Sequence, residues 1–164
     1  MFRGFSTANQ IKGGASLSTL GRFLYRGTTR GWPGSRSSQR LGITSASSDP
    51  LVATLFALHC YGVYGQGVVY AAKADDLQSL LCAGNVLNQR EREIGLQMTC
   101  EEFQHRAIRE CHALEVRQHL VDLGFKAHLP ERLLDNEALN RAINLSPRLT
   151  SEELRNFETR FVGV

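Results

Sequence analysis

The sequence of 164 residues contains no run of about 18–20 apolar residues, the length that a helix needs to cross a membrane. Residues 1–14 lack the apolar segment of a secretory signal peptide, so we expect any export to use another route. The four cysteines form no Cys-x-x-Cys pair and show no disulfide-framework spacing, which favours free thiols in a reducing compartment. The length suits one domain with a hydrophobic core, which we expect to span residues 1–164.

Lysine is scarce as well, and arginine carries nearly all of the positive charge. Lys12, Lys73 and Lys126 are the only lysines, for which a GC-rich genome is the simplest explanation. The net charge of +3 is modest, and no basic run occurs. An arginine-rich surface can attract nucleic acid, but this pattern gives only weak support for such a partner.

Two glutamates lie two residues apart at the start of a strand-like pattern. Alternation along residues 89–98 places Glu91 and Glu93 on one face together with Gly95 and Gln97. The Cα atoms of two such glutamates lie roughly 6.5–7 Å apart, so both carboxylates can act on one substrate. A solvated strand face is the common alternative for so short a motif. The opposite face, which we expect to be buried, comprises Ile94, Leu96 and Met98.

An earlier apolar strand, FLYRG over residues 23–27, ends at Arg26 and Gly27. A guanidinium group presents a rigid fork of donors that suits a pyrophosphate. Glycine allows a ligand to approach the backbone closely. An exposed arginine at a strand end is the ordinary alternative.

A third segment, ITSAS over residues 43–47, predicts a hydroxyl-rich strand that carries Ser45 and Ser47. Asp49 and Pro50 follow directly and predict the N-cap and first turn of a helix. This helix is apolar at helical spacing, so we expect it to be buried. On its own the segment is an ordinary strand, turn and helix.

Taken together, the three segments resemble the arginine–serine–glutamate class of mono-ADP-ribosyltransferases, many of which are bacterial toxins. Members place an arginine after an aromatic-rich strand, then a Ser-Thr-Ser-like strand and a helix of the form Asp-x-x-x-Ala-x-x-Phe-Ala. An E-x-E or Q-x-E motif follows at the start of a later strand. The resemblance covers residues 22–98. The matching residues are Arg26; Ser45 and Ser47; Asp49, Ala53, Phe56 and Ala57; and Glu91 and Glu93.

This resemblance implies an α+β fold: an ADP-ribosyltransferase-like sandwich of two small, mostly antiparallel sheets with flanking helices and a helical C-terminal region. NAD+ would bind in the cleft between the sheets, without a metal. The implied reaction cleaves the nicotinamide–ribose bond of NAD+ and transfers ADP-ribose to a target macromolecule. Cleavage of this bond makes the ribose oxocarbenium-like, as in glycoside hydrolysis.

The resemblance also implies residue roles. Glu93 would stabilise the oxocarbenium-like ribose, and Ser45 would orient Glu93. Arg26 would bind the pyrophosphate, and the Gly27 backbone the nicotinamide amide. Glu91 would orient or deprotonate the acceptor, and arginine is the first expectation because members with glutamate there commonly modify arginine. The predicted NAD+-binding residues are Arg26, Gly27, Thr28 and Ser47.

Two departures from the family pattern stand out. Ala46 replaces the central threonine of Ser-Thr-Ser, although Ser45 is retained. The interval between Arg26 and Ser45 is short and has little helical periodicity, which leaves open how the adenine end of NAD+ is covered. An aromatic ring usually packs on the nicotinamide, and the candidates are Trp32, Tyr61 and Tyr64.

Three other functions remain open: NAD+ hydrolysis with water as acceptor, ADP-ribosylation of nucleic acid, and a non-catalytic module that binds a partner. For a transferase we expect NAD+, a target protein of a host or competitor cell and, for a toxin, an immunity protein as partners, and no membrane. We expect a secreted or injected effector that acts in the target-cell cytoplasm, and otherwise a cytoplasmic protein.

The C-terminal part, residues 99–164, is rich in helical patterns. A capping box of Thr99 and Glu102 opens a predicted helix over residues 99–123, with Gly124 after its end. His105, His112 and His119 would share one face of this helix, about 10.5 Å apart along its axis, which is too far for one metal ion to bridge. The other predicted elements are a buried strand over 67–72, a short helix or turn over 75–82, a polar loop over 84–90, a strand over 124–129, and helices over 135–144 and 151–161.

Overall fold

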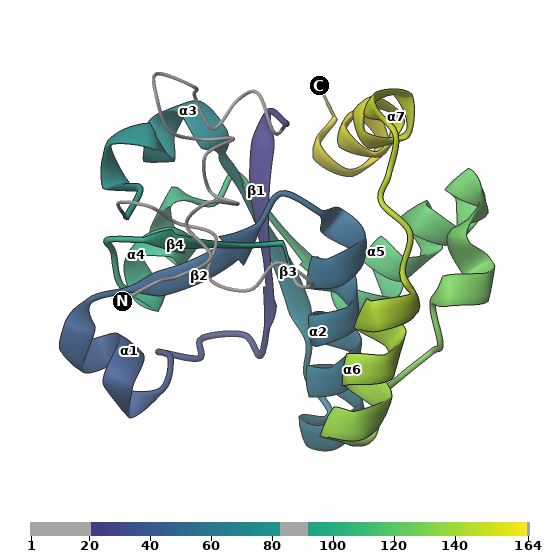
Figure 1. Ribbon diagram of the computed structural model, residues 1–164, viewed down its shortest axis with the longest axis horizontal. Coiled ribbons are helices and arrows are strands. Elements are labelled where there is room, and N and C mark those ends of the chain that lie inside the picture. Colours follow the sequence, from purple (N-terminus) through teal and green to yellow (C-terminus); the bar gives the residue numbers. More distant parts are fainter. Residues whose placement is uncertain (1–20, 83–91, 164) are drawn as a thin grey trace.

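The computed structural model describes residues 21–82 and 92–163. It has the predicted α+β class, with one five-stranded antiparallel sheet in the order β4-β2-β1-β3-β5 and flanking helices (Figure 1). The strands are β1 (Phe23–Thr28), β2 (Thr44–Ser47), β3 (Val68–Lys73), β4 (Glu93–Leu96) and β5 (Arg109–His112). The described helices are α1 (Arg36–Leu41), α2 (Pro50–Tyr64), α3 (Ala74–Leu77), α4 (Cys100–Arg106), α5 (Ala113–Leu120), α6 (Asn136–Leu145) and α7 (Ser151–Val162).

The described strands differ from the predicted pair of small sheets, because β1 joins them all into one. β1 pairs with β3 along its whole length, from Phe23↔Lys73 to Thr28↔Val68. It pairs with β2 at a single position, Tyr25↔Ser47. We call β4 and β2 one half of the sheet and β1, β3 and β5 the other half. The two halves are joined through this one residue pair, and beyond it the described strands β1 and β2 are not paired.

Helices cover both faces of the sheet (Figure 1). One face packs against α2, α5, α6 and α7, and the other packs against α3 and α4. The ring of Tyr25 in β1 contacts Phe157 and Phe161 of α7, with ring centroids 5.6 and 6.3 Å apart. The helix-rich C-terminal residues therefore contribute to the same core as β1 and α2.

Helix α2 lies directly against the backbone of the sheet at two glycines. A Cβ atom on Gly27 would lie 1.8 Å from the Ala53 carbonyl oxygen, and one on Gly67 would lie 2.0 Å from the Ala57 carbonyl oxygen. Both contacts are with helix backbone, so a side chain at either position must displace the helix. These two glycines set the distance between α2 and the sheet.

The predicted helix starts are confirmed. The Asp49 carboxylate accepts a hydrogen bond from the Leu51 amide at 2.8 Å, and Pro50 occupies the first helical position of α2. These contacts satisfy a donor that the first turn of a helix leaves free. The capping boxes of α4 and α7 are also present, formed by Thr99 with Glu102 and by Thr150 with Glu153.

The predicted single helix over residues 99–123 is wrong, because this segment forms α4, β5 and α5. Ala107 leaves the helical conformation with φ −65° and ψ 133°. The chain then pairs with β3, where Cys111 lies opposite Val69. Hydrogen bonding to an open sheet edge thus overrides the local helical pattern. As a result, the three histidines lie on α4, β5 and α5 rather than on one helix face: His105, His112 and His119.

The predicted strand over residues 124–129 is also wrong. Gly124 has φ 103°, and a 3₁₀ turn follows over Lys126–His128. Phe125 and Leu129 are buried, but Ala127, which a strand would place on the same face, is exposed.

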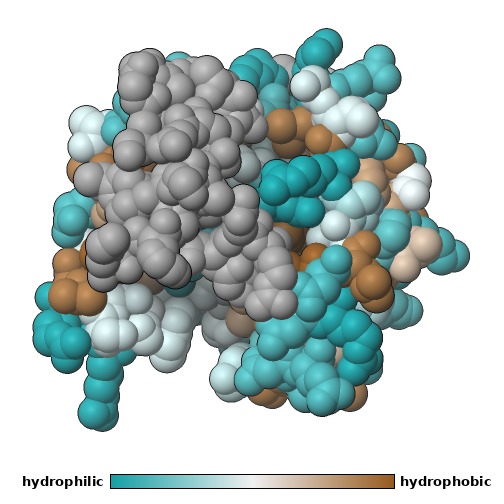
Figure 2. Space-filling model, in the orientation of Figure 1, coloured by the Kyte–Doolittle hydropathy of each residue, from teal (hydrophilic) through white to brown (hydrophobic). Residues whose placement is uncertain are grey.

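The surface of the described residues is mixed. On the face drawn in Figure 2, apolar residues form separate small patches among polar ones over the right-hand part of the molecule. No helix in the described ranges is long and apolar enough to cross a membrane. Scattered patches of this kind are normal for a protein surface.

The contact between α2 and the sheet predicts a large effect of a small substitution. Gly67→Ala places a methyl group on the α2 backbone and should lower the free energy of unfolding by about 3 kcal/mol. Gly65→Asn is the matched control: Gly65 has φ +76° and open space around it, and asparagine tolerates this conformation. Urea denaturation of both variants measures the difference, and equal losses would contradict the close-packing argument.

Candidate active site

Residues from three strands and α2 line one pocket of about 250 Å³. Arg26 and Gly27 come from β1, Ser45 and Ser47 from β2, and Glu93 from the first position of β4. The structure thus brings together the arginine, serine and second glutamate that the sequence singled out. The rest of the lining comprises Tyr25, Ala46, Val52, Ala53 and Phe56.

Strand register fixes how the polar residues of the pocket lie. Ser47 is directly opposite Glu93, and Ser45 is opposite Gly95. Because side chains alternate along a strand, both serines and Glu93 lie on the same face of the sheet. Ser47 is the direct cross-strand neighbour of Glu93, and Ser45 is its diagonal neighbour. The alternate face is buried as predicted at Ile94, Leu96 and Met98.

Arg26 is held where β1 and β2 part. Its Nη1 donates a hydrogen bond to the Ser45 carbonyl oxygen at 2.8 Å. Its Nε is buried and has no hydrogen-bond partner among the described residues. The guanidinium is therefore fixed through one terminal nitrogen, and its Nε is enclosed by the protein.

Tyr25 also lines the pocket, and its ring packs into the core against α7. Its ring is fully buried, and its hydroxyl has no hydrogen-bond partner among the described residues. Burial raises the pKa of this hydroxyl well above its usual value, and the negative charge of Glu158 raises it further. Tyr25 therefore stays protonated at neutral pH.

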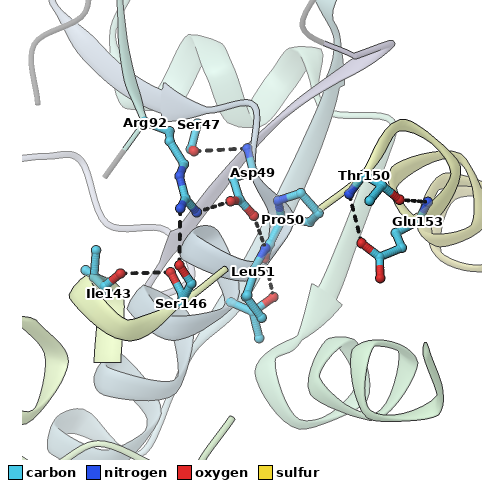
Figure 3. A network of polar contacts seen from close by, with 10 residues as sticks. Ser47, Asp49, Pro50, Leu51, Arg92, Ile143, Ser146, Thr150 and Glu153 are labelled. Atoms are coloured by element: carbon cyan, nitrogen blue, oxygen red, sulfur yellow. Dashed lines mark hydrogen bonds and ion pairs between the residues drawn. The ribbon is translucent and has the colours of Figure 1, made fainter. Parts of the chain in front are cut away.

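A buried ionic network fixes the residue before Glu93 (Figure 3). Arg92 forms an ion pair with Asp49, and its other terminal nitrogen donates to the Ser146 carbonyl oxygen at 3.3 Å. The Ser47 hydroxyl accepts a hydrogen bond from the Asp49 amide at 3.0 Å. The start of β4, the N-terminus of α2 and the end of α6 are thereby joined beside the pocket.

Two residues of this network have unusual properties: the backbone conformation of Arg92 and the pKa of Asp49. Arg92 has φ 51°, an uncommon left-handed conformation for a residue other than glycine. Burial raises the pKa of Asp49, whereas the positive charge of Arg92 and the Leu51 amide act to lower it. A buried ion pair such as that of Arg92 and Asp49 fixes the relative position of the segments it joins more than it adds to the free energy of unfolding.

Other predicted site residues lie elsewhere. Thr28 lines a second pocket, together with Trp32 and Tyr64. The Tyr61 ring packs edge-on against His112, with centroids 5.4 Å apart. None of these aromatic candidates lines the first pocket. Glu91 and the predicted loop 84–90 lie outside the described residues.

Phe56 is an aromatic residue of the first pocket that the sequence analysis did not place there. It follows Ala53 by one helical turn on α2, and both line the pocket. The sequence analysis identified Phe56 as part of the apolar helix and of the family motif, without a role in the pocket. Gly27 is the sequence feature that could have indicated this position, because a glycine there lets this turn of α2 approach β1 closely.

The described residues offer no evident metal site. Within 21–82 and 92–163, no group of three or more His, Cys, Asp or Glu side chains is placed to hold an ion. All four cysteines are free thiols; Cys100 and Cys111 are buried, and Cys60 and Cys82 are half-buried.

Comparison of the chain with protein-family models, curated proteins and solved structures found no match in any of the three. The chemistry of the pocket is nevertheless specific. Glu93, the half-buried Arg26 and the two serines of β2 line one small cavity. Such a set suits a ligand that combines an anionic group with a centre that becomes positively charged during reaction.

Removal of one partner of the buried ion pair should be costly. Asp49→Asn keeps an acceptor for the helix N-cap but leaves the Arg92 side chain, only 11% exposed, without its counter-charge. We expect a loss of about 3 kcal/mol in the free energy of unfolding. Glu137→Gln, which breaks an exposed pair with Arg141, is the control and should cost far less. Similar urea midpoints for the two variants would argue against this interpretation.

Proposed function

We propose that this chain is a mono-ADP-ribosyltransferase of the arginine–serine–glutamate class. It cleaves the nicotinamide–ribose bond of NAD+ and transfers ADP-ribose to a macromolecule, in the first instance an arginine of a target protein, as a bacterial toxin or effector. The observation that supports this proposal is the pocket shared by Arg26, Ser45 and Glu93, which come from three separate strands.

The finer form of the predicted fold is part of the proposal. The β4-β2 half and the β1-β3-β5 half correspond to the two small sheets of the family, joined at Tyr25↔Ser47. NAD+ would enter where the halves part, since Arg26 and Ser45 line the pocket there. As the resemblance implies, the Gly27 backbone would bind the nicotinamide amide.

The reaction requires stabilisation of positive charge at the ribose. When the bond from nicotinamide to ribose C1′ breaks, the electron pair leaves with nicotinamide and C1′ becomes oxocarbenium-like. The Glu93 carboxylate would stabilise that charge and accept a hydrogen bond from the ribose 2′-hydroxyl. The acceptor then bonds to C1′ and loses a proton. Glu91 keeps its predicted role toward the acceptor.

Arg26 and Ser45 would act as one unit. The Ser45 carbonyl fixes the Arg26 guanidinium through Nη1, and the guanidinium would bind a phosphate oxygen. The Ser45 side chain lies on the same face as Glu93, diagonal to it across β2 and β4. The serine thus connects the group that would bind the pyrophosphate with the group that would stabilise the ribose.

Labelled NAD+ tests the proposal, with and without cell lysate. Glu93→Gln should reduce nicotinamide release about 10²–10³-fold, because it removes the negative charge that would stabilise the oxocarbenium-like ribose in the transition state. Glu101→Gln, an exposed carboxylate in the first turn of α4, serves as the control and should retain activity. An intact protein that consumes no NAD+ under any condition would refute the proposal.

The fate of the label distinguishes the alternatives. Label on a macromolecule that depends on Glu93 supports a transferase, and its removal by protease rather than nuclease identifies a protein target. Nicotinamide release without macromolecular label in any lysate indicates NAD+ hydrolysis. Label that nuclease removes indicates a nucleic-acid target.

Phe56 should contact the nicotinamide in place of the aromatic residues that the sequence suggested. Phe56→Ala removes the ring from the pocket, and we expect the KM for NAD+ to rise about 10-fold. Phe56→Tyr keeps the ring and is the matched control. Steady-state nicotinamide release measures both, and an unchanged KM in Phe56→Ala would place the nicotinamide elsewhere.

A further inference from the structure

Residues 29–42 form a segment between β1 and β2 that we call the arginine arm. The arm contains α1, which buries none of its own residues and lies at one end of the molecule, away from α6 and α7 (Figure 1). Arg30, Arg36 and Arg40 all belong to the arm and are exposed, and residues 27–48 contain no aspartate or glutamate. The arm therefore presents a positively charged surface that is separate from the core.

Backbone contacts hold the arm in place while its large side chains stay exposed. The Gln104 side chain donates a hydrogen bond to the Trp32 carbonyl oxygen at 3.1 Å. The Gln97 side chain donates to the Leu41 carbonyl oxygen at 3.3 Å. The side chains of Trp32 and Leu41 are nevertheless 48% and 57% exposed. The arm is thus preorganised, which lowers the entropic cost of binding a partner.

The two arginines of α1 have an unfavourable electrostatic environment. Arg36 and Arg40 are four residues apart, so they are neighbours on one helix face, where like charges destabilise a helix. Arg36 also places a positive charge in the first turn, where the helix dipole favours a negative one. Neither arginine forms an ion pair with a residue in 21–82 or 92–163, whereas Arg30 pairs with Glu110 at 2.8 Å. A bound carboxylate would relieve this repulsion.

The composition of the arm favours an acidic protein over a nucleic acid as its partner. Tryptophan and arginine are enriched among the residues that contribute most to protein–protein binding. A guanidinium also binds a carboxylate through two parallel hydrogen bonds. Tight binding to DNA commonly uses about 6–10 phosphate contacts, whereas α1 offers two arginines beside exposed apolar side chains. Carboxylates interspersed with apolar groups match both parts of the arm.

We propose that the arginine arm is a docking surface for an acidic face of a partner protein. Carboxylates of the partner bind Arg36 and Arg40, and apolar side chains of the partner pack against Trp32 and Leu41. Helix α1 is only about 9 Å long, so these four side chains are within reach of one partner surface. The arm shares no lining residue with the first pocket, and its role does not depend on cleavage of NAD+.

Poly-L-glutamate with a fluorophore at one end is the probe for this surface, because it presents carboxylates without bases or phosphates. Its fluorescence anisotropy should rise saturably on titration with the protein at low salt, where exposed charges are least screened. The double variant Arg36→Gln with Arg40→Gln should weaken this binding about 10-fold. The matched control, Arg132→Gln with Arg155→Gln, removes two exposed arginines outside the arm and should have a far smaller effect.

Urea denaturation shows that the loss of binding is not a loss of folding. The arm variant should unfold at a urea concentration no lower than the unchanged protein, because it loses a like-charge pair and no contact.

Three results would overturn the docking surface. They are no saturable binding of poly-L-glutamate, equal losses in the two double variants, and tighter binding of a labelled single-stranded oligonucleotide of equal charge through the same two arginines. The last would assign the arm to nucleic acid. No NAD+ is present in these titrations, so their outcome is independent of the proposed function.

Discussion

The direct contact between α2 and the backbone of the sheet is the constraint on which the other features depend. No side chain separates the helix from β1 at Gly27 or from the β3 end at Gly67. This distance brings Ala53 and Phe56 over the first pocket and carries the later turns of α2 into the second. One helix thus forms a wall of both cavities.

The buried ion pair makes the position of Glu93 dependent on the C-terminal helices. Arg92 precedes Glu93 directly, and its guanidinium connects Asp49 at the start of α2 with Ser146 at the end of α6. The desolvation cost of a buried ion pair offsets much of its favourable electrostatic energy. Its main effect is therefore to select one arrangement of the segments that it joins. The residues after 99 therefore help to define the pocket as well as the core, although none of them lines it.

Local patterns were sufficient to predict the elements that local interactions stabilise. The N-cap at Asp49, the alternation at Ile94 and Leu96 and the strand of Arg26 all follow from neighbours in sequence. The strand β5 could not be found this way, because its stability comes from pairing with β3. The position of Phe56 in the pocket lining was missed for a related reason: a core residue and a pocket residue have the same helical spacing, and only the packing of α2 on Gly27 distinguishes them.

The contact between α2 and Gly27 also limits which substitutions the chain can accept during evolution. Because the Ala53 backbone leaves no room for a Cβ atom at position 27, selection for folding alone retains glycine there. A descendant without the proposed catalysis would keep Gly27 and remain free to replace Arg26 and Glu93. Invariance of the glycine among relatives would thus reflect the packing of α2, whereas joint retention of the arginine and the glutamate would support the proposed enzyme.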